Sequence, residues 1–161
     1  GLPMKKVRTE TMARDDKRNG TTTLFAALDV KTGEVIGECL PKHRAEEFIR
    51  FLKTIDRVVA RQHAVHAICD NCSTHKTPQV QAWLAKHPRF KLHFIPTSSS
   101  WLDLVERPIA EITRQKIRRG AFKNVDDLIA AIEAWIENRN AKPKPFEWTA
   151  EADTILDKNQ L

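Results

Sequence analysis

Two extended apolar runs joined by a short turn, followed at once by a helical repeat, limit the fold more than any other part of the sequence. Residues 21–30 are rich in β-branched and apolar side chains, Lys31–Glu34 has turn composition, and residues 35–40 form a second such run. This pattern is typical of a β-hairpin. From Ala45 to about Arg61 the apolar residues recur at helical spacing instead. A hairpin that leads into a helix predicts a mixed α/β fold with helices packed on a sheet.

Further apolar runs predict two more strands and four more helices. The strands are expected at residues 66–70 and 90–95, where apolar residues lie close together and Pro96 follows the second run. The first of these helices has Thr77 as its N-cap and Pro78 at its first position, and the second runs from Ser100 or Asp103 to about Gly120. The third is capped by Asn124, and the fourth runs from Thr149 to about Lys158. This order predicts a mixed sheet with helices on its faces.

The chain divides into one core and two flanking segments. Residues 1–20 carry six basic and three acidic side chains without a sustained apolar period, so we expect a basic N-terminal arm exposed to solvent. Residues 21–140 hold the main elements and suit a single domain. Residues 141–161 begin with the linker Lys142-Pro143-Lys144-Pro145 and end with the short last helix. The start at Gly1-Leu2-Pro3 is abrupt, and we expect the chain to be a piece of a longer protein.

Composition narrows the class of protein. The chain has 27 Lys and Arg against 21 Asp and Glu, a net charge of +6, which favours partners that carry phosphate. No apolar run approaches the ~20 residues of a membrane span, and no signal peptide is visible. The 3 cysteines do not suggest a disulfide framework. We therefore expect a soluble cytoplasmic protein with no membrane contact.

A carboxylate at the end of a predicted strand marks the candidate site. The apolar run 67–69 leads to Asp70, polar residues follow it, and Glu106 lies near the start of a later amphipathic segment. If that helix packs against the strand, the two carboxylates converge, as hard divalent cations require. From the residues alone a plainer alternative stays open, in which Asp70 starts a turn and Glu106 is favoured near a helix N-terminus by the helix dipole.

Several longer stretches carry a resemblance. They are TTTLFAALDV, DNCSTHKTP, HFIPTSSSWLDLVER, EITRQKIRRG and PKPFEWTA, and the most specific parts are Asp70-Asn71 with His75 and the PTSSSWL segment before Glu106. Together they span nearly the whole chain, which resembles the catalytic domain of bacterial insertion-sequence transposases of the mariner superfamily. The resemblance implies a ribonuclease H-like fold, in which three acidic residues bind two divalent metal ions and cut and rejoin DNA.

Carried over residue by residue, the resemblance gives Asp70 the role of the second catalytic acid and Glu106 that of the third, both as metal ligands. The implied cofactor is Mg²⁺ or Mn²⁺. The implied partners are the terminal repeats of an insertion sequence and target DNA, with a homodimer in synapsis. Such an enzyme would hydrolyse phosphodiester bonds at the ends of the element and transfer strands in the bacterial cytoplasm, at the nucleoid when bound to DNA.

The sequence departs from the family pattern at its start. In the family the first acid lies on the first strand, in an Asp-Glu pair upstream of the segment that resembles Gly1-Leu2-Pro3, so we expect the first strand to be absent here. The N-terminal helix-turn-helix region of the family is absent too. Asp29 aligns with the second strand of the family's sheet and is interpreted as the start of the hairpin turn. We therefore expect the chain alone to be inactive or nearly so.

Two departures lie near the third acid. Pro108 stands where relatives usually carry a large aromatic residue, and it would cost ~3 kcal/mol inside a helix that had already begun at Ser100 or Asp103. A helix that restarts at Pro108 avoids this cost. Asp103 stands where relatives often carry Asn, and its negative charge would weaken or reshape metal binding.

Basic residues supply the expected contacts with DNA. Arg107, Arg114, Arg118 and Arg119 lie on or just beyond one predicted helix, and Lys76 lies beside the metal site. Such residues meet phosphates without reading sequence. A solvated helix face, with Glu111 paired to Arg114, is the alternative. Of the other residues expected to shape the site, Asn71 and Asp103 adjoin the acids, and His75 orients a ligand or phosphate or bonds to its own loop.

Two competing interpretations remain open. Cys69 and Cys72 have the spacing of a zinc knuckle, with His63, His66 and His75 nearby. Residues three apart on a strand point to opposite faces, however, so this set cannot converge. At the level of function, the alternative to a transposase domain is a non-catalytic remnant of a decayed element that acts at most as a nonspecific DNA-binding protein.

Overall fold

The computed structural model describes residues 4–12, 22–96, 107–117 and 122–143. The strands are β1 (Met4–Met12), β2 (Thr22–Asp29), β3 (Val35–Leu40), β4 (Val65–Asp70) and β5 (Phe90–Ile95). The helices are α1 (Ala45–Val58), η1 (Ser73–Lys76), α2 (Pro78–Lys86), η2 (Thr113–Ile117) and α4 (Val125–Ala141), and residues 107–112 are also helical.

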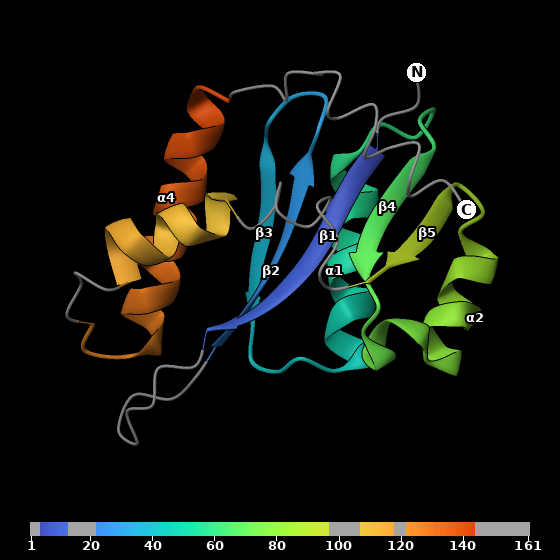
Figure 1. Ribbon diagram of the computed structural model, residues 1–161, viewed down its shortest axis with the longest axis horizontal. Coiled ribbons are helices and arrows are strands. Elements are labelled where there is room, and N and C mark those ends of the chain that lie inside the picture. Colours follow the sequence, from blue (N-terminus) through green and yellow to red (C-terminus); the bar gives the residue numbers. More distant parts are fainter. Residues whose placement is uncertain (1–3, 13–21, 97–106, 118–121, 144–161) are drawn as a thin grey trace.

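The strands form one mixed sheet in the order β3-β2-β1-β4-β5 (Figure 1). β2 pairs antiparallel with both β1 and β3, whereas β4 pairs parallel with both β1 and β5. The chain therefore leaves the hairpin at one edge and crosses to the other half of the sheet through α1. The predicted mixed α/β class is confirmed.

The central strand corrects two expectations. Residues 4–12 were expected to be an exposed arm and instead form β1, paired on both sides with β2 and β4. Val7, Thr9 and Thr11 alternate along this segment, a period-two signal of β-branched residues that the charged residues between them concealed. The central position of the sheet, which was expected to be empty, is occupied as well, because β1 lies between β2 and β4; the absence of the family's Asp-Glu strand stays a prediction.

The predicted hairpin and its turn are confirmed. Asp29 and Glu34 close the turn through an amide-to-carbonyl hydrogen bond of 2.8 Å, and the Asp29 carboxylate accepts from the Lys31 amide at 3.1 Å. Gly33 has a φ of 79°, a conformation that costs glycine least. Asp29 is thus the residue that starts the turn, as expected.

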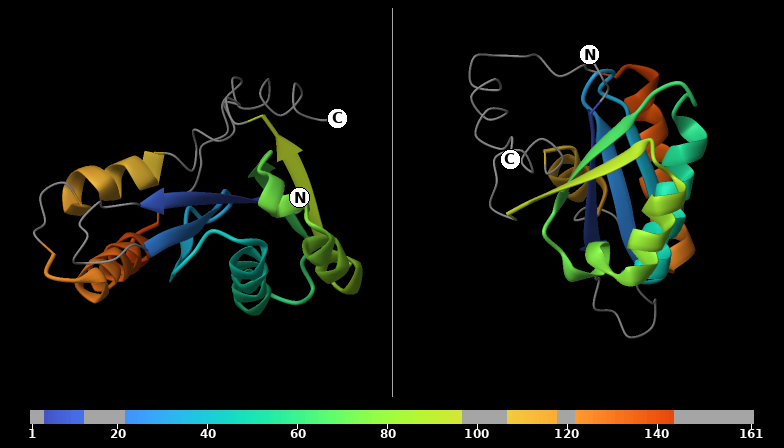
Figure 2. Two further views of the ribbon diagram at one scale, coloured as in Figure 1. Left: turned by 90° about the horizontal axis from the view of Figure 1, so that it is seen from below. Right: turned by 90° about the vertical axis from the view of Figure 1, so that its right-hand side faces the viewer.

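The two faces of the sheet bury separate apolar clusters. Alternate residues of β2 point to opposite faces, so Phe25 and Ala27 pack with α1 and α2, whereas Leu24, Ala26 and Leu28 pack with α4 and helix 107–112. Figure 2 shows α1 and α2 on the same side of the sheet. The predicted core positions Trp83 and Trp135 are 8% and 7% exposed and join different clusters.

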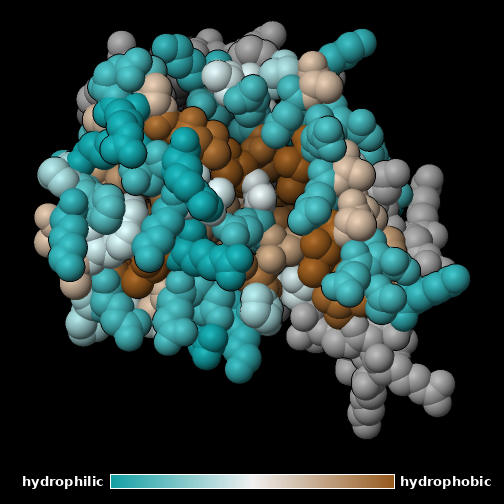
Figure 3. All heavy atoms as spheres, turned by 180° about the vertical axis from the view of Figure 1, so that it is seen from behind, coloured by the Kyte–Doolittle hydropathy of each residue, from teal (hydrophilic) through white to brown (hydrophobic). Residues whose placement is uncertain are grey.

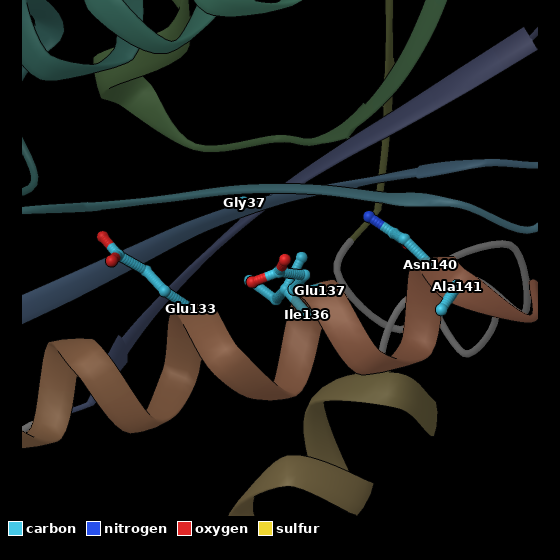
Figure 4. Close-up of a pocket in the computed structure, with 6 residues that line it drawn as sticks. All are labelled: Gly37, Glu133, Ile136, Glu137, Asn140 and Ala141. Carbon is cyan, nitrogen blue, oxygen red and sulfur yellow. The ribbon is translucent and has the colours of Figure 1, made fainter.

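The edge strand β3 is held by α4. The Asn140 side chain accepts a hydrogen bond from the Val35 amide and donates one to the Val35 carbonyl, both of 2.8 Å, as a neighbouring strand would. Further along, Gly37 leaves room for Ile136, whose Cδ1 would clash with a Cβ at residue 37. The α4 side chains face β3 across an open groove of about 530 Å³ (Figure 4). Glu133 and Glu137 line this groove, so its charge does not suit phosphate.

The helix boundaries agree with the sequence in most places. Thr77 caps α2 through the Val80 amide, and Asn124 caps α4 through the Asp127 amide, as predicted. The expected helix from residue 100 or 103 to Gly120 is described from 107 to 117, and its last five residues form the π-helical turn η2. Pro108 is buried at the start of the described helical stretch. Residues 144–161, which hold the second half of the expected linker and the expected last helix, lie outside the described residues.

Hydrophilic residues cover most of the molecular face seen from behind, with hydrophobic residues showing between them (Figure 3). Among the described large hydrophobic residues, Val58 is the exposed one, at 59%. No described helix has the length and apolar character needed to cross a bilayer.

Candidate active site

Asp70 ends β4 at the carboxyl edge of the parallel half of the sheet. It lies opposite Ile95 of β5, and its neighbour Cys69 lies opposite Val7 of β1. The Asp70 side chain is 20% exposed. The strand thus presents a carboxylate at its end with one part inside the fold and one part reachable from solvent, as the sequence predicts.

His75 lies against the Asp70 carboxylate. Its Nδ1 lies 3.3 Å from Asp70 Oδ1 and 3.4 Å from the Asp70 carbonyl oxygen. The His75 ring is fully buried and stacks on Phe48 of α1, with 4.1 Å between ring centroids. A buried ring cannot reach a phosphate in solvent, so of the two expected roles the structure favours the bond to the loop and to Asp70.

The loop after Asp70 folds through local hydrogen bonds. The His75 amide donates to the Cys72 carbonyl at 3.1 Å, closing η1, and Cys72 Sγ lies 3.1 Å from Thr74 Oγ1. Thr77 then caps α2. These contacts turn the chain back so that His75, five residues beyond Asp70, returns beneath it.

His43 is the residue of this neighbourhood that the sequence did not indicate. It precedes α1, and its ring lies edge-on to His75 with 6.0 Å between centroids. Burial lowers the pKa of His43, the neighbouring His75 lowers it further, and Asp70 acts in the opposite direction. Among the described residues, His43 Nε2 is buried without a hydrogen-bond partner. No spacing rule links His43 to Asp70, because α1 and β4 intervene between them in the sequence.

Two further predicted residues lie close to Asp70 in the chain and face solvent. Asn71 follows it directly and is exposed. Lys76 ends η1, is exposed, and has its Nζ 4.9 Å from the centre of the Phe94 ring of β5. A cation over an aromatic face keeps its charge available while its stem is packed. Lys76 therefore presents a positive charge on the β4–β5 side of the site.

The predicted arginines of the next helix are only partly within the described residues. Arg107 and Arg114 are both exposed. Glu111, which the alternative of a solvated helix face would pair with Arg114, instead lies 3.3 Å from Arg139 of α4 and accepts a hydrogen bond from Gln115. This pairing joins helix 107–112 to α4. Glu106, Asp103, Arg118 and Arg119 lie outside the described residues.

The donor set fits a hard divalent cation in part. Asp70 offers carboxylate oxygen, the ligand that Mg²⁺ and Mn²⁺ prefer, at a partly exposed strand end. Within the described residues, the one three-membered group of His, Cys, Asp and Glu side chains with converging ligand atoms is His43, Cys72 and His75. Its chemistry is nitrogen and sulfur, so it does not supply further oxygen ligands to an ion at Asp70.

Comparison with known proteins agrees with this arrangement. A family model described as DDE superfamily endonuclease matches residues 2–129. An uncharacterized 39 kDa protein of insertion element IS630 from Shigella sonnei is 35% identical over 86 residues, which are 52% of this chain and 24% of that protein. The chain thus spans about a quarter of the length of this relative.

Solved structures with similar folds are retroviral integrase catalytic cores. The core of BIV integrase has a TM-score of 0.64 at 12% identity, with 98% of this chain and 96% of that chain covered. The core of HTLV-2 integrase, solved with magnesium in a dimeric form, has a TM-score of 0.61 at 16% identity, with 84% and 85% covered. These likenesses show the ribonuclease H-like fold. Because the family model covers most of its length, the chain belongs to the DDE superfamily of endonucleases.

Proposed function

We propose that this chain is the catalytic domain of an insertion-sequence transposase, which hydrolyses phosphodiester bonds at the ends of the element and transfers the strands to target DNA. The observation that carries the proposal is the position of Asp70, at the carboxyl end of β4 in a sheet ordered β3-β2-β1-β4-β5. The family to which the chain belongs and the name of the IS630 relative support it.

In this proposal Asp70 and Glu106 are the catalytic and metal-binding acids. Asp70 supplies carboxylate oxygen to Mg²⁺ or Mn²⁺, and His75 keeps that carboxylate oriented through its Nδ1. Bound at these carboxylates, such ions would supply activation of the attacking water and stabilisation of the departing 3′-oxygen. Asn71 shapes the site from the adjacent position, and the charge of Asp103 modifies it. The resemblance places the first acid of the triad in an Asp-Glu pair upstream of the segment that matches Gly1-Leu2-Pro3, and we assign that role to no residue of β1.

Basic residues hold the DNA. Lys76, Arg107, Arg114, Arg118 and Arg119 contact phosphates of the terminal repeats and the target, and Lys76 is placed nearest to Asp70 along the chain. Phosphate contacts give salt-dependent affinity without base reading. Synapsis of two ends would need a homodimer, and the protein would act at the bacterial nucleoid in the cytoplasm.

A strand-nicking assay with Mg²⁺ or Mn²⁺ tests the catalytic part of the proposal. The purified chain is expected to be inactive or nearly so, and a longer protein that includes the upstream reading frame is expected to nick DNA. Asp70→Asn should abolish nicking in that longer protein, because an amide cannot replace the anionic metal ligand. The matched control is Asp126→Asn, an exposed acid in the first turn of α4, which should retain activity. Robust nicking by the purified chain that is lost in Asp70→Ala would contradict the need for an outside acid.

The second candidate is a non-catalytic DNA-binding remnant, and β1 is the observation that favours it. β1 lies in the central position of the sheet, between β2 and β4, and its sequence MKKVRTETM contains no aspartate. If no Asp-Glu strand is encoded immediately upstream, the triad cannot be completed. Two observations would then select this candidate. The reading frame before Gly1 would encode no Asp-Glu strand, and the protein would bind DNA in a salt-dependent way without nicking it.

A further inference from the structure

We propose that His43, Cys72 and His75 form a binding site for a transition metal ion of the Zn²⁺ class, next to Asp70 and separate in its chemistry from the carboxylate site. Each of the three offers one ligand atom, and these atoms all lie within 4.8 Å of one another. The site rests on this geometry and does not depend on the proposed transposase activity.

The three residues come from segments that the fold brings together. His43 lies just before α1, Cys72 lies between β4 and η1, and His75 lies within η1. A closed tetrahedral zinc site with bonds of about 2.0–2.3 Å places its ligand atoms roughly 3.5 Å apart. The three ligand atoms lie within 4.8 Å of one another, which exceeds this spacing by at most about 1.3 Å, so modest side-chain shifts would close the site around an ion. Cys72 would exchange its contact with Thr74 Oγ1 for the metal.

His43 provides the strongest sign that something is missing from this cluster. Its Nε2 is buried, and no described residue forms a hydrogen bond to it. A buried polar atom without a partner costs about 1–3 kcal/mol, and such atoms in native structures commonly mark an ion or a water. Phe25 packs against the ring of His43 and Phe48 against the ring of His75, which keeps both rings beside the cluster.

The ligand types select the ion. Two imidazoles and one thiolate favour Zn²⁺ and other borderline or soft cations, whereas Mg²⁺ and Mn²⁺ prefer oxygen. Asp70 lies against His75 Nδ1, in the way that carboxylates orient ligating histidines. An open fourth position would take water or a ligand from outside the described residues.

This set differs from the zinc knuckle that the cysteine spacing suggests. Cys69 is fully buried within β4, where burial raises the pKa of its thiol far above the ordinary range. His66 lies against His93 on β5 instead, with 3.1 Å between ring nitrogens. Cys72 and His75 therefore find their third partner in His43, and the spacing Cys69-to-Cys72 has no part in the site.

Cobalt titration of the purified, metal-stripped chain tests the proposal. One Co²⁺ per chain should bind with a thiolate-to-cobalt charge-transfer band, and one equivalent of Zn²⁺ should remove that band. Cys72→Ser should eliminate the band, and His43→Gln should weaken binding at least tenfold. The controls are Cys39→Ser, a partly buried cysteine outside the cluster, and His63→Gln, an exposed histidine; both should bind as the parent chain does.

Folding is followed separately by circular dichroism and thermal unfolding of each metal-free protein. Zn²⁺ should raise the Tm of the parent chain and of both controls, but not that of Cys72→Ser, because ligand binding to the native state stabilises it. If both site variants fail to fold, the charge-transfer band of the parent chain decides. Absence of that band, or Co²⁺ binding by Cys72→Ser equal to that of the parent, would overturn the proposal.

Discussion

At the scale of single residues, Arg89 does more for the fold than its place in a loop suggests. Its guanidinium lies 2.6 Å from Asp56 Oδ1 and donates to the carbonyl oxygens of Asp56, Val59, Ala60 and His63. These carbonyls belong to the end of α1 and the segment after it, where helices leave acceptors unpaired. The Arg89 side chain, between α2 and β5, therefore caps the C-terminal end of α1 and holds in place the segment that leads from α1 into β4.

Replacement of Arg89 by lysine should destabilise the protein by about 2 kcal/mol, since an ammonium lacks the planar fork that serves several acceptors at once. The free energy of unfolding in urea measures the loss. Arg61→Lys, at an exposed arginine in the segment after α1, should change it by less than about 0.5 kcal/mol. Equal effects of the two substitutions would show that the Arg89 contacts contribute little.

The sequence predicted the position of Asp70 at the end of a strand, because this residue directly follows a buried apolar run, while its catalytic role stays a prediction that rests on the resemblance. It did not identify His43. Local rules relate residues a few positions apart, and the contact between His43 and His75 is made only when α1 packs against the sheet. The surroundings of Asp70 thus follow from tertiary packing, which periodicity does not encode.

At the scale of elements, the hairpin, β5, α2 and the start of α4 follow from local chemistry, while β1 does not. Thr77, Asn124 and Gly33 each satisfy a local hydrogen bond or dihedral requirement, so their elements could be predicted. β1 is rich in charge and is stabilised by strands on both of its sides. Its strand conformation depends on partners distant in sequence, which local sequence patterns do not reveal.

The attachment of α4 to the sheet gives a prediction at this scale. Asn140→Asp keeps the acceptor for the Val35 amide but removes the donor to the Val35 carbonyl and places a negative charge there. We expect a loss of about 1–3 kcal/mol in the free energy of unfolding. Asn138→Asp adds the same charge two residues earlier on an exposed position of α4, so it controls for the unfavourable helix dipole. Comparable losses in both variants would argue that the Val35 contact is unimportant.

At the scale of the whole molecule, the two halves of the sheet carry different tasks. The antiparallel half, β2 with β3, packs on α4 and helix 107–112, and it holds no predicted catalytic residue. The parallel half, β1 with β4 and β5, carries Asp70 at its carboxyl edge, which is where ligands bind in open α/β sheets. The stability of the parallel half therefore bears directly on the candidate site.

A histidine pair makes the stability of that half depend on pH. His66 on β4 and His93 on β5 stack with 5.4 Å between ring centroids, and their Nδ1 and Nε2 atoms lie 3.1 Å apart. Burial lowers the pKa of His93, and the neighbouring His66 lowers it further. The hydrogen bond needs one neutral ring nitrogen as acceptor, so protonation of both rings removes it.

The sign of the pH effect follows from this lowered pKa. Between the folded pKa of His93 and its ordinary value of about 6.5, the unfolded chain binds more protons than the folded one, so the stability is complete above that range and falls as pH decreases through it. His43, whose pKa is also lowered, acts in the same direction. The urea concentration at the unfolding midpoint should therefore decrease as the pH is lowered from 7.5 to 5.5. The contribution of His93 to the lost free energy of unfolding should be below about 1 kcal/mol, because its ring is partly solvated. His93→Gln should reduce this pH dependence and the exposed His63→Gln should leave it unchanged; an identical pH dependence in His93→Gln and the parent chain would rule out the pair as its source.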